Sequence, residues 1–315
     1  MSFEVIVPFL RPIAHLLCDP HISEVMVNGS GRVFVERSGQ LEAVPNVTIR
    51  EQNLRVAVRN LARVLGDDIS EERPLLDSRL PDGSRVAAAL PPVSLGGTTL
   101  TIRKFQSRFF STDELVQTGT LTAAQLACLR LGIEARANVL ISGGTGTGKT
   151  TLLNALATFL PPDDRLVLIE DTAELRLEAS NVVRFEARRE QPGVPAVTIR
   201  DLVRATLRHR PDRIVLGEVR GGEAFDLLQA LNTGHSGTLS TIHANSAEQA
   251  LSRFASCVMQ SGVDVPYQAV RLAIAECLQL LVHLERRHGQ RVVTQVMRLR
   301  RYLPATDTYE FAEAS

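Results

Sequence analysis

Short apolar runs in the first hundred residues predict a small α+β domain over residues 1–105. Residues 24–28 and 32–36 flank a glycine-containing turn, and this arrangement is typical of a β-hairpin. Leucine and valine recur at helical spacing between positions 54 and 65, which predicts an amphipathic helix. Two more strands are expected at residues 85–90 and 100–105, followed by a polar linker over residues 106–122.

After this linker the pattern changes, and short apolar runs alternate with helical patterns through residues 123–315. Such alternation predicts an α/β domain in which helices cover a parallel sheet. One helix should start at a glycine-rich loop and stop at Pro161-Pro162, and another should start with a capping box of Ser246 and Gln249. The expected strands are residues 138–142, 166–169, 214–216, 239–242, 278–284 and 292–299.

Composition lowers the expectation of a dedicated nucleic-acid binder. Thirty-five basic residues balance 35 acidic ones, tryptophan is absent and aromatic residues make up only 4% of the 315 residues. A basic surface and a base-stacking platform are therefore both hard to build, and no direct contact with nucleic acid is expected.

Four widely spaced cysteines predict reduced thiols and no zinc site. No basic leader opens the chain, and no apolar run reaches the roughly 18 residues of a membrane span. We therefore expect a soluble cytoplasmic protein that reaches a membrane only through protein partners.

Residues 143–150 match the phosphate-loop pattern G-x-x-x-x-G-K-[ST] and lie between a predicted strand and a predicted helix. Curled backbone N–H groups and the positive end of the helix should hold the phosphates of ATP. We expect Lys149 to reach the β- and γ-phosphates and the Thr150 hydroxyl to bind Mg²⁺. The expected nucleotide contacts are Gly143, Gly144, Thr145, Gly146, Thr147, Gly148, Lys149, Thr150 and Thr151.

Carboxylates follow two of the predicted strands at the ends that should face the phosphate loop. Glu218 is the candidate to orient or activate the attacking water, because Gly217 occupies the place of the usual metal-binding aspartate. Glu170 or Asp171 should help to hold Mg²⁺, with Glu170 slightly favoured, and Glu170 and Glu218 are expected to act on the metal through water.

Several segments together resemble the type II/type IV secretion ATPases. Residues 169–175 are similar to their Asp box, residues 208–220 to their Walker B motif and residues 232–245 to their His box. Residues 80–86 and 100–105 fit the N-terminal domain of that family, and the Tad/Flp pilus and conjugal-transfer branch is the most similar. A tetracysteine zinc site and a long N-terminal extension, both found in parts of the family, are missing.

The resemblance implies a RecA-like P-loop domain hinged to a smaller N-terminal domain, with ATP held between them. It also implies a homohexameric ring that docks on a polytopic inner-membrane platform of a secretion, pilus or conjugation system. His243 would sense the γ-phosphate, while Arg85 and Arg103 would clamp phosphate. Arg208, together with Arg204 and Arg220, would supply further positive charge in the same subunit or a neighbour.

Two other functions stay open at this point. One is a nucleic-acid motor on the same fold, which single-stranded DNA would stimulate in a salt-sensitive way. The other is a nucleotide-gated assembly subunit with little turnover, against which the presence of Glu218 argues.

Overall fold

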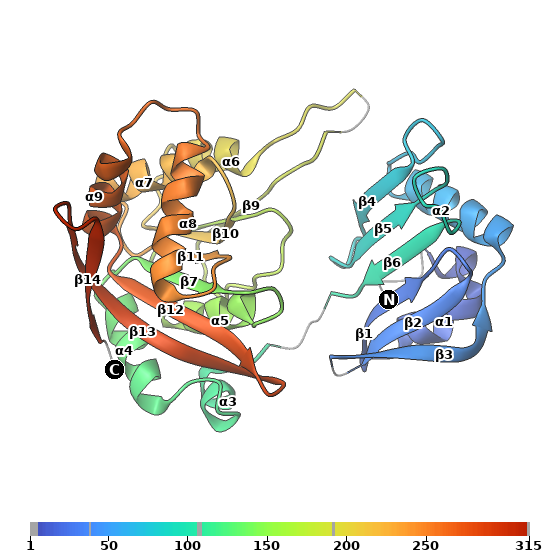
Figure 1. The fold of residues 1–315 in the computed structure, drawn as a ribbon, viewed down its shortest axis with the longest axis horizontal. Coiled ribbons are helices and arrows are strands. Elements are labelled where there is room, and N and C mark those ends of the chain that lie inside the picture. The colour runs from blue at the N-terminus through green and yellow to red at the C-terminus, as the bar shows by residue number, and fades with distance from the viewer. Residues whose placement is uncertain (1–5, 38, 106–108, 191–192, 314–315) are drawn as a thin grey trace. The chain divides into compact units, whose positions relative to one another are not determined.

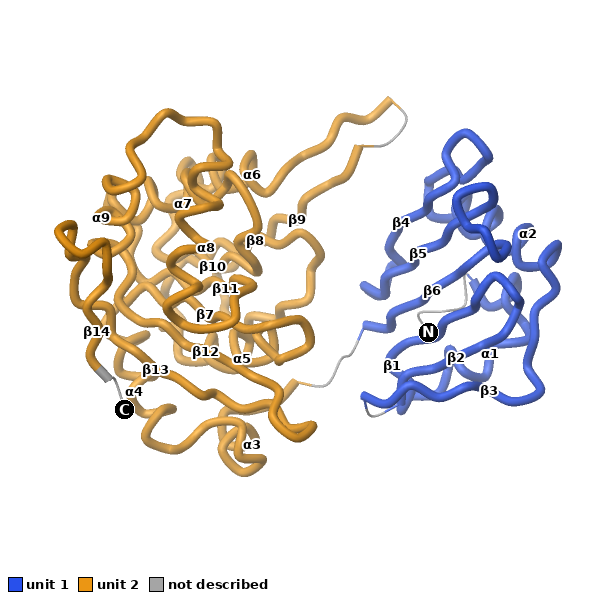
Figure 2. Tube along the Cα trace, viewed as in Figure 1, with its two compact units in different colours: residues 1–108 blue, residues 109–315 orange. Residues whose placement is uncertain are grey.

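The structure is a computed structural model, and it describes residues 6–37, 39–105, 109–190 and 193–313. The chain divides into two compact units, residues 1–108 and 109–315 (Figure 2). Each unit has its own hydrophobic core.

The first unit is a six-stranded antiparallel sheet with the strand order β3-β2-β1-β6-β5-β4. Helix α2 buries Leu54, Val58 and Leu61 in the core of this unit, as their helical spacing predicted. The elements are η1 Val7–Phe9, η2 Arg11–Ile13, α1 Ala14–Cys18, β1 Ile22–Val27, β2 Arg32–Arg37, β3 Gln40–Thr48, α2 Glu51–Val64, β4 Leu75–Arg79, β5 Arg85–Ala89 and β6 Thr99–Arg103.

The second unit contains an eight-stranded sheet with the order β14-β13-β12-β7-β11-β10-β8-β9 (Figure 1). The strands from β12 to β9 run parallel, and β13 and β14 continue the sheet antiparallel. Its elements are α3 Thr112–Gln117, α4 Ala123–Glu134, β7 Val139–Gly143, α5 Lys149–Leu156, η3 Ala157–Phe159, β8 Leu166–Glu170, β9 Val182–Glu186, α6 Ile199–Thr206, β10 Arg213–Val219, α7 Glu223–Asn232, β11 Leu239–Ile242, α8 Ala247–Met259, α9 Tyr267–Cys277, β12 Leu280–Arg287, β13 Gln290–Leu303 and β14 Thr308–Glu313.

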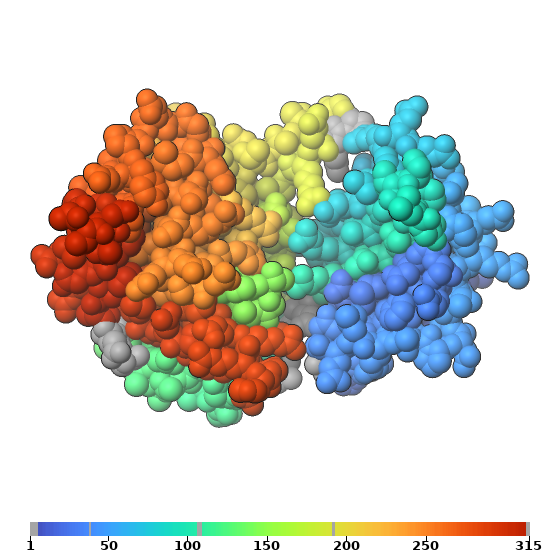
Figure 3. All heavy atoms as spheres, viewed as in Figure 1, coloured from blue at the N-terminus to red at the C-terminus, as the bar shows by residue number. Residues whose placement is uncertain are grey.

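Both faces of the central strands are buried, because alternate side chains point to opposite layers of helices. Leu140 packs into the core that α6 to α9 share, whereas Val139 and Ile141 pack with α3, α4 and α5. This two-sided burial explains why the central strands are continuous apolar runs in the sequence. Helix α8 and the β12–β13 hairpin lie on the face of this unit that Figure 3 shows.

The segment predicted as a linker, residues 106–122, differs from that expectation in its described part. Helix α3 forms within it and is capped at Ser111, and Leu115 and Leu121 are buried in the core of the second unit. Their burial binds residues 109–122 to this unit, and residues 106–108 lie outside the described part of the chain. Because the segment is rich in polar residues, its sequence did not indicate that these two leucines are buried.

The capping box predicted at the start of α8 forms only in part among the described residues. Ser246 Oγ accepts a hydrogen bond from the backbone N–H of Gln249 at 3.0 Å. The side chain of Gln249 instead lines a pocket beside the phosphate loop. No helix in the described parts of the chain is long and apolar enough to cross a membrane.

Candidate functional site

The phosphate loop runs from the end of β7 into α5, as the sequence predicted. Gly148 stands at the N-cap of α5 with φ at +95°, a conformation that side chains with a Cβ rarely adopt. A Cβ on Gly143 would lie 2.6 Å from the Thr147 hydroxyl oxygen and 2.6 Å from the carbonyl oxygen of Leu284. These two glycines therefore allow the backbone to curl tightly in front of the helix.

Lys149 is buried inside this curl. Its ammonium group donates to the carbonyl oxygens of Gly143 at 3.0 Å and Gly144 at 2.9 Å. The imidazole of His243 lies 3.4 Å from the same nitrogen. Burial lowers the pKa of Lys149, and the negative charge of Glu218 opposes that shift. The ammonium group of the lysine is thus held at the loop by hydrogen bonds to two backbone carbonyl oxygens.

Glu218 and His243 meet at the carboxyl ends of the adjacent parallel strands β10 and β11. Oε1 of Glu218 lies 3.2 Å from Nε2 of His243. The register between the strands shifts after Leu216, so β10 carries one extra residue at Gly217-Glu218. Bulges of this kind re-aim a side chain and are frequent beside active sites. Here the shift accompanies the close approach of the glutamate to the histidine.

Arg220 holds two carboxylates at this edge. Its guanidinium contacts both oxygens of Glu218, at 2.9 and 3.1 Å, and reaches Oδ2 of Asp171 at 2.9 Å. The hydrogen bond that Arg220 donates to Glu218 is the largest cause that raises the pKa of Arg220. The bidentate arginine occupies the oxygens that a water would approach.

His243 has a lowered pKa, chiefly because of its partial burial and then because of the positive charge of Lys149. The lowered pKa favours the neutral imidazole. A neutral imidazole has one donor and one acceptor nitrogen, so it suits hydrogen bonding to a phosphate oxygen.

Glu170 lies at the end of β8, next to the β10 strand, and is only 3% exposed. Its Oε1 accepts hydrogen bonds from the backbone N–H groups of Glu174 at 2.8 Å and Leu175 at 2.9 Å. Burial is the largest effect and raises the pKa of this carboxyl to about 7. A Cβ on Gly217 would lie 3.2 Å from Cγ of Glu170, so the missing side chain leaves the space that Glu170 fills.

The same edge of the sheet offers the donors that magnesium prefers, which are a hydroxyl and carboxylate oxygens. Thr150 opens the helix after Lys149, and Glu218 and Glu170 end strands that converge there. One carboxylate oxygen of Glu170 accepts a hydrogen bond from the turn that follows β8, and Asp171 accepts one from Arg220. The oxygen donors present at this edge therefore fit a magnesium ion bound with a nucleotide.

The predicted arginines divide into two groups. Arg85 and Arg103 are directly opposite each other on β5 and β6 of the first unit, and Arg79 is opposite Arg85 on β4. Arg208 is exposed between α6 and β10, at the edge where the parallel strands begin. The phosphate loop follows the opposite edge of the sheet, so Arg208 lies away from the loop of its own subunit, and its role in the same subunit or a neighbour stays a prediction.

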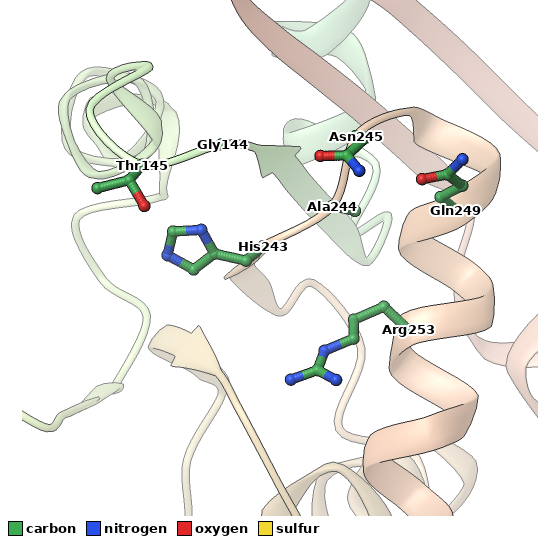
Figure 4. A pocket seen from close by; sticks show the side chains of 7 residues that line it. All are labelled: Gly144, Thr145, His243, Ala244, Asn245, Gln249 and Arg253. Carbon is green, nitrogen blue, oxygen red and sulfur yellow. The ribbon is translucent and has the colours of Figure 1, made fainter.

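Two pockets lie beside the loop and share Thr145, His243 and Arg253. The first, of about 440 Å³, is shown in Figure 4 and continues along α8 to Asn245 and Gln249. The second, of about 410 Å³, includes Glu218, Val219 and Arg220. The edge of the sheet at the phosphate loop therefore has pockets beside the ends of β10 and β11 and beside α8.

Sequence reasoning missed two arginines at this site. Arg253 lies four residues after Gln249, so the helical spacing of this pair was the available signal. Arg291 donates from Nε to the carbonyl oxygen of Gly146 at 3.2 Å, and its Cδ would lie 3.1 Å from a Cβ on Gly148. It comes from β13, far along the chain, and nothing local marks its role.

Comparison with known proteins gives consistent matches along most of the chain. A family model described as "Type II/IV secretion system protein" matches residues 10–306. The conjugal transfer protein TrbB of Rhizobium radiobacter is 38% identical over 290 residues, which cover 91% of this chain and 86% of that protein.

Solved structures agree with this match. The VirB11 ATPase of the Brucella suis type IV secretion system is 32% identical, with coverage of 94% of this chain and 95% of that chain and a TM-score of 0.50. The Legionella pneumophila ATPase DotB shares the fold, with a TM-score of 0.64, 21% identity and coverage of 93% of this chain and 81% of that chain. The second unit has the RecA-like P-loop fold that the sequence predicted.

Proposed function

The chain belongs to the family of type II/IV secretion system proteins, and from this premise we propose that it is an ATP-hydrolysing motor subunit of such a system. The observation that carries the proposal is the convergence of Lys149, Glu218 and His243 at the end of the phosphate loop. Phosphoryl transfer to water uses a phosphate-binding loop with its lysine and a group that positions the water, and an imidazole can add a hydrogen bond to a phosphate oxygen.

In this proposal, residues 143–151 bind the phosphates of ATP through backbone N–H groups, and Lys149 moves from the loop carbonyls to the β- and γ-phosphates. Thr150 holds Mg²⁺, with Glu170 and Glu218 acting through water. The metal, when bound, neutralises the charge that develops on the phosphate oxygens. Glu218 orients the attacking water once Arg220 releases its oxygens, and His243 donates a hydrogen bond to the γ-phosphate.

The remaining arginines are assigned by their place in the fold. Arg85 and Arg103 lie directly opposite each other in the first unit, and each has a carboxylate nearby: Asp77 is 4.0 Å from Arg85, and Glu24 is opposite Arg103 on β1. We assign them to the phosphate clamp of the nucleotide. Arg208 lies at the edge of the sheet opposite the phosphate loop, and we assign it to the nucleotide site of a neighbouring copy.

We further propose that copies of the chain form a homohexameric ring in the cytoplasm that docks on a polytopic inner-membrane platform protein. The name of the Rhizobium relative favours a role in conjugal transfer, and the name of the Brucella relative favours a type IV secretion system. Light scattering in the presence of an ATP analogue is expected to give the molar mass of a hexamer. A monomer at every concentration would contradict the assembly.

The catalytic assignment is tested by two substitutions. Lys149→Ala should abolish ATP binding or hydrolysis, whereas Glu218→Gln should keep binding of an ATP analogue and stop turnover. Glu248→Gln, an exposed carboxylate on α8, is the matched control and should hydrolyse ATP at the parental rate. If Glu218→Gln hydrolyses ATP as fast as the parent does, Glu218 is not the water-orienting group.

A further inference from the structure

Helix α8 brings one more cation to the wall of the nucleotide pocket. We propose that Arg253 is a catalytic residue that acts within its own subunit, where its guanidinium contacts the terminal phosphate of ATP during hydrolysis. The inference rests on the proposed ATPase function and names a group of the same site that no sequence motif identified.

Placement is the first argument. Helix α8 follows β11 directly, so the strand that ends next to His243 also fixes the start of the helix. Gln249 and Arg253 are four residues apart and lie on the same side of α8. Figure 4 shows both side chains extending from α8 toward the pocket, and in this view the His243 imidazole lies between Thr145 of the phosphate loop and the Arg253 guanidinium. Arg253 also borders the pocket that contains Glu218.

The second argument is the state of the guanidinium itself. Arg220 is held by Glu218 and Asp171, and Lys149 is held by two loop carbonyls. Among the residues that the structure describes, no hydrogen bond or ion pair joins the Arg253 side chain to another group. Its positive charge nevertheless reaches the catalytic edge, because it contributes to the lowered pKa of His243.

An exposed arginine without a partner is ordinarily a solvated surface group. Arg253 differs because it borders both pockets at the phosphate loop and has no carboxylate to neutralise it. Several negative charges arrive with the triphosphate, whereas Arg220 at this edge is held by carboxylates. Like Lys149 and Arg291, Arg253 forms no ion pair with a carboxylate among the described residues. A free guanidinium facing that position is complementary to the charge on the phosphate oxygens.

The step that Arg253 would assist is the attack of water on the γ-phosphorus. A new P–O bond forms to the water oxygen, and the bond between the γ-phosphorus and the bridging oxygen breaks. ADP leaves with the bonding electron pair, and Glu218 receives or relays the water proton. Arg253 keeps its own proton and stabilises the charge on the equatorial oxygens, which increases most in the transition state.

The experiment compares Arg253→Ala and Arg253→Lys with the parent, in full-length protein. We expect Arg253→Ala to lower kcat by about 10²- to 10³-fold and to change KM and the affinity for an ATP analogue much less. Arg253→Lys keeps the charge but loses the planar fork, so its kcat should lie in between. Arg298→Ala removes another exposed arginine, on β13, and should leave kcat unchanged.

Thermal melting separates catalysis from folding, since Arg253→Ala should melt as the parent does. Titration of His243 by NMR gives a readout that a structural role would not move, because the loss of the nearby charge should raise the pKa of the imidazole. A kcat within threefold of the parent for Arg253→Ala would overturn the inference. If Lys149→Ala also hydrolyses ATP normally, the proposed ATPase function itself fails, and the two failures are thereby distinguished.

Discussion

Replacing Glu170 by glutamine should make the protein more stable at pH 8 and leave it nearly unchanged at pH 4.5. Burial raises the pKa of the Glu170 carboxyl from 4.5 to about 7, although two backbone N–H groups favour its ionised form. The folded protein keeps this proton between those pH values, whereas the unfolded chain releases it. The free energy of unfolding therefore falls as the pH rises from about 4.5 to about 7, and it is level above that range.

The size of the effect follows from the shift. About 2.5 pH units at about 1.4 kcal/mol each correspond to at most about 3.5 kcal/mol at pH 8. Glutamine is neutral and nearly the same shape, and its side-chain oxygen can accept the same two hydrogen bonds from the backbone of Glu174 and Leu175. Glu170→Gln should therefore recover most of that energy above pH 7.

The assay is guanidinium unfolding followed by circular dichroism at pH 4.5, 6 and 8, because the chain has no tryptophan. Glu178→Gln makes the same chemical change at an exposed position and serves as the control. A Glu170→Gln protein that is less stable than the parent at pH 8, or that keeps the parental slope with pH, would refute the reasoning.

Three further predictions concern groups in contact with the same site. Gly217→Ala would place a methyl carbon 3.2 Å from Cγ of Glu170 and should cost about 1–3 kcal/mol of stability; an unchanged denaturant midpoint would contradict this. Gly148→Ala forces a side chain into φ +95° against Arg291, so calorimetry should show at least about tenfold weaker binding of an ATP analogue; parental affinity would speak against the loop geometry. His243 should titrate below 6.5 in NMR spectra, and its midpoint should rise in Lys149→Ala; a midpoint above 6.5 in the parent would show that burial does not control the imidazole.

Much of the second unit could be predicted from sequence because its central strands bury both faces. Strands β7, β8, β10 and β11 are continuous apolar runs, and the phosphate loop between β7 and α5 is marked by its glycines. In contrast, β3 and β4 are edge strands of the first sheet, and β9 and β14 are edge strands of the second. Every residue of β3 is at least partly exposed, so the strand lacks the apolar signal by which strands are recognised.

Some residues of the candidate site could likewise be predicted from the sequence, and others could not. Lys149, Glu218 and His243 follow buried strands, and their sequence positions predicted where they meet. Glu218 lies at a one-residue register shift between β10 and β11, and Arg220 contacts both of its carboxylate oxygens. Neither feature could be predicted from the order of the residues. Arg253 and Arg291 come from elements outside the motifs, and only tertiary packing brings them to the loop.

The contact between Arg291 and the phosphate loop also has a consequence for biosynthesis. The guanidinium of Arg291 binds a carbonyl that precedes it by 145 residues, and β12, which lies just before it in the chain, pairs with the strand that leads into the loop. A ribosome therefore releases Gly146 and Lys149 long before the segments that border them have been made. The nascent chain completes its nucleotide-binding surface only after residue 291 has emerged, so ATP cannot engage the finished surface before the start of β13 has been made.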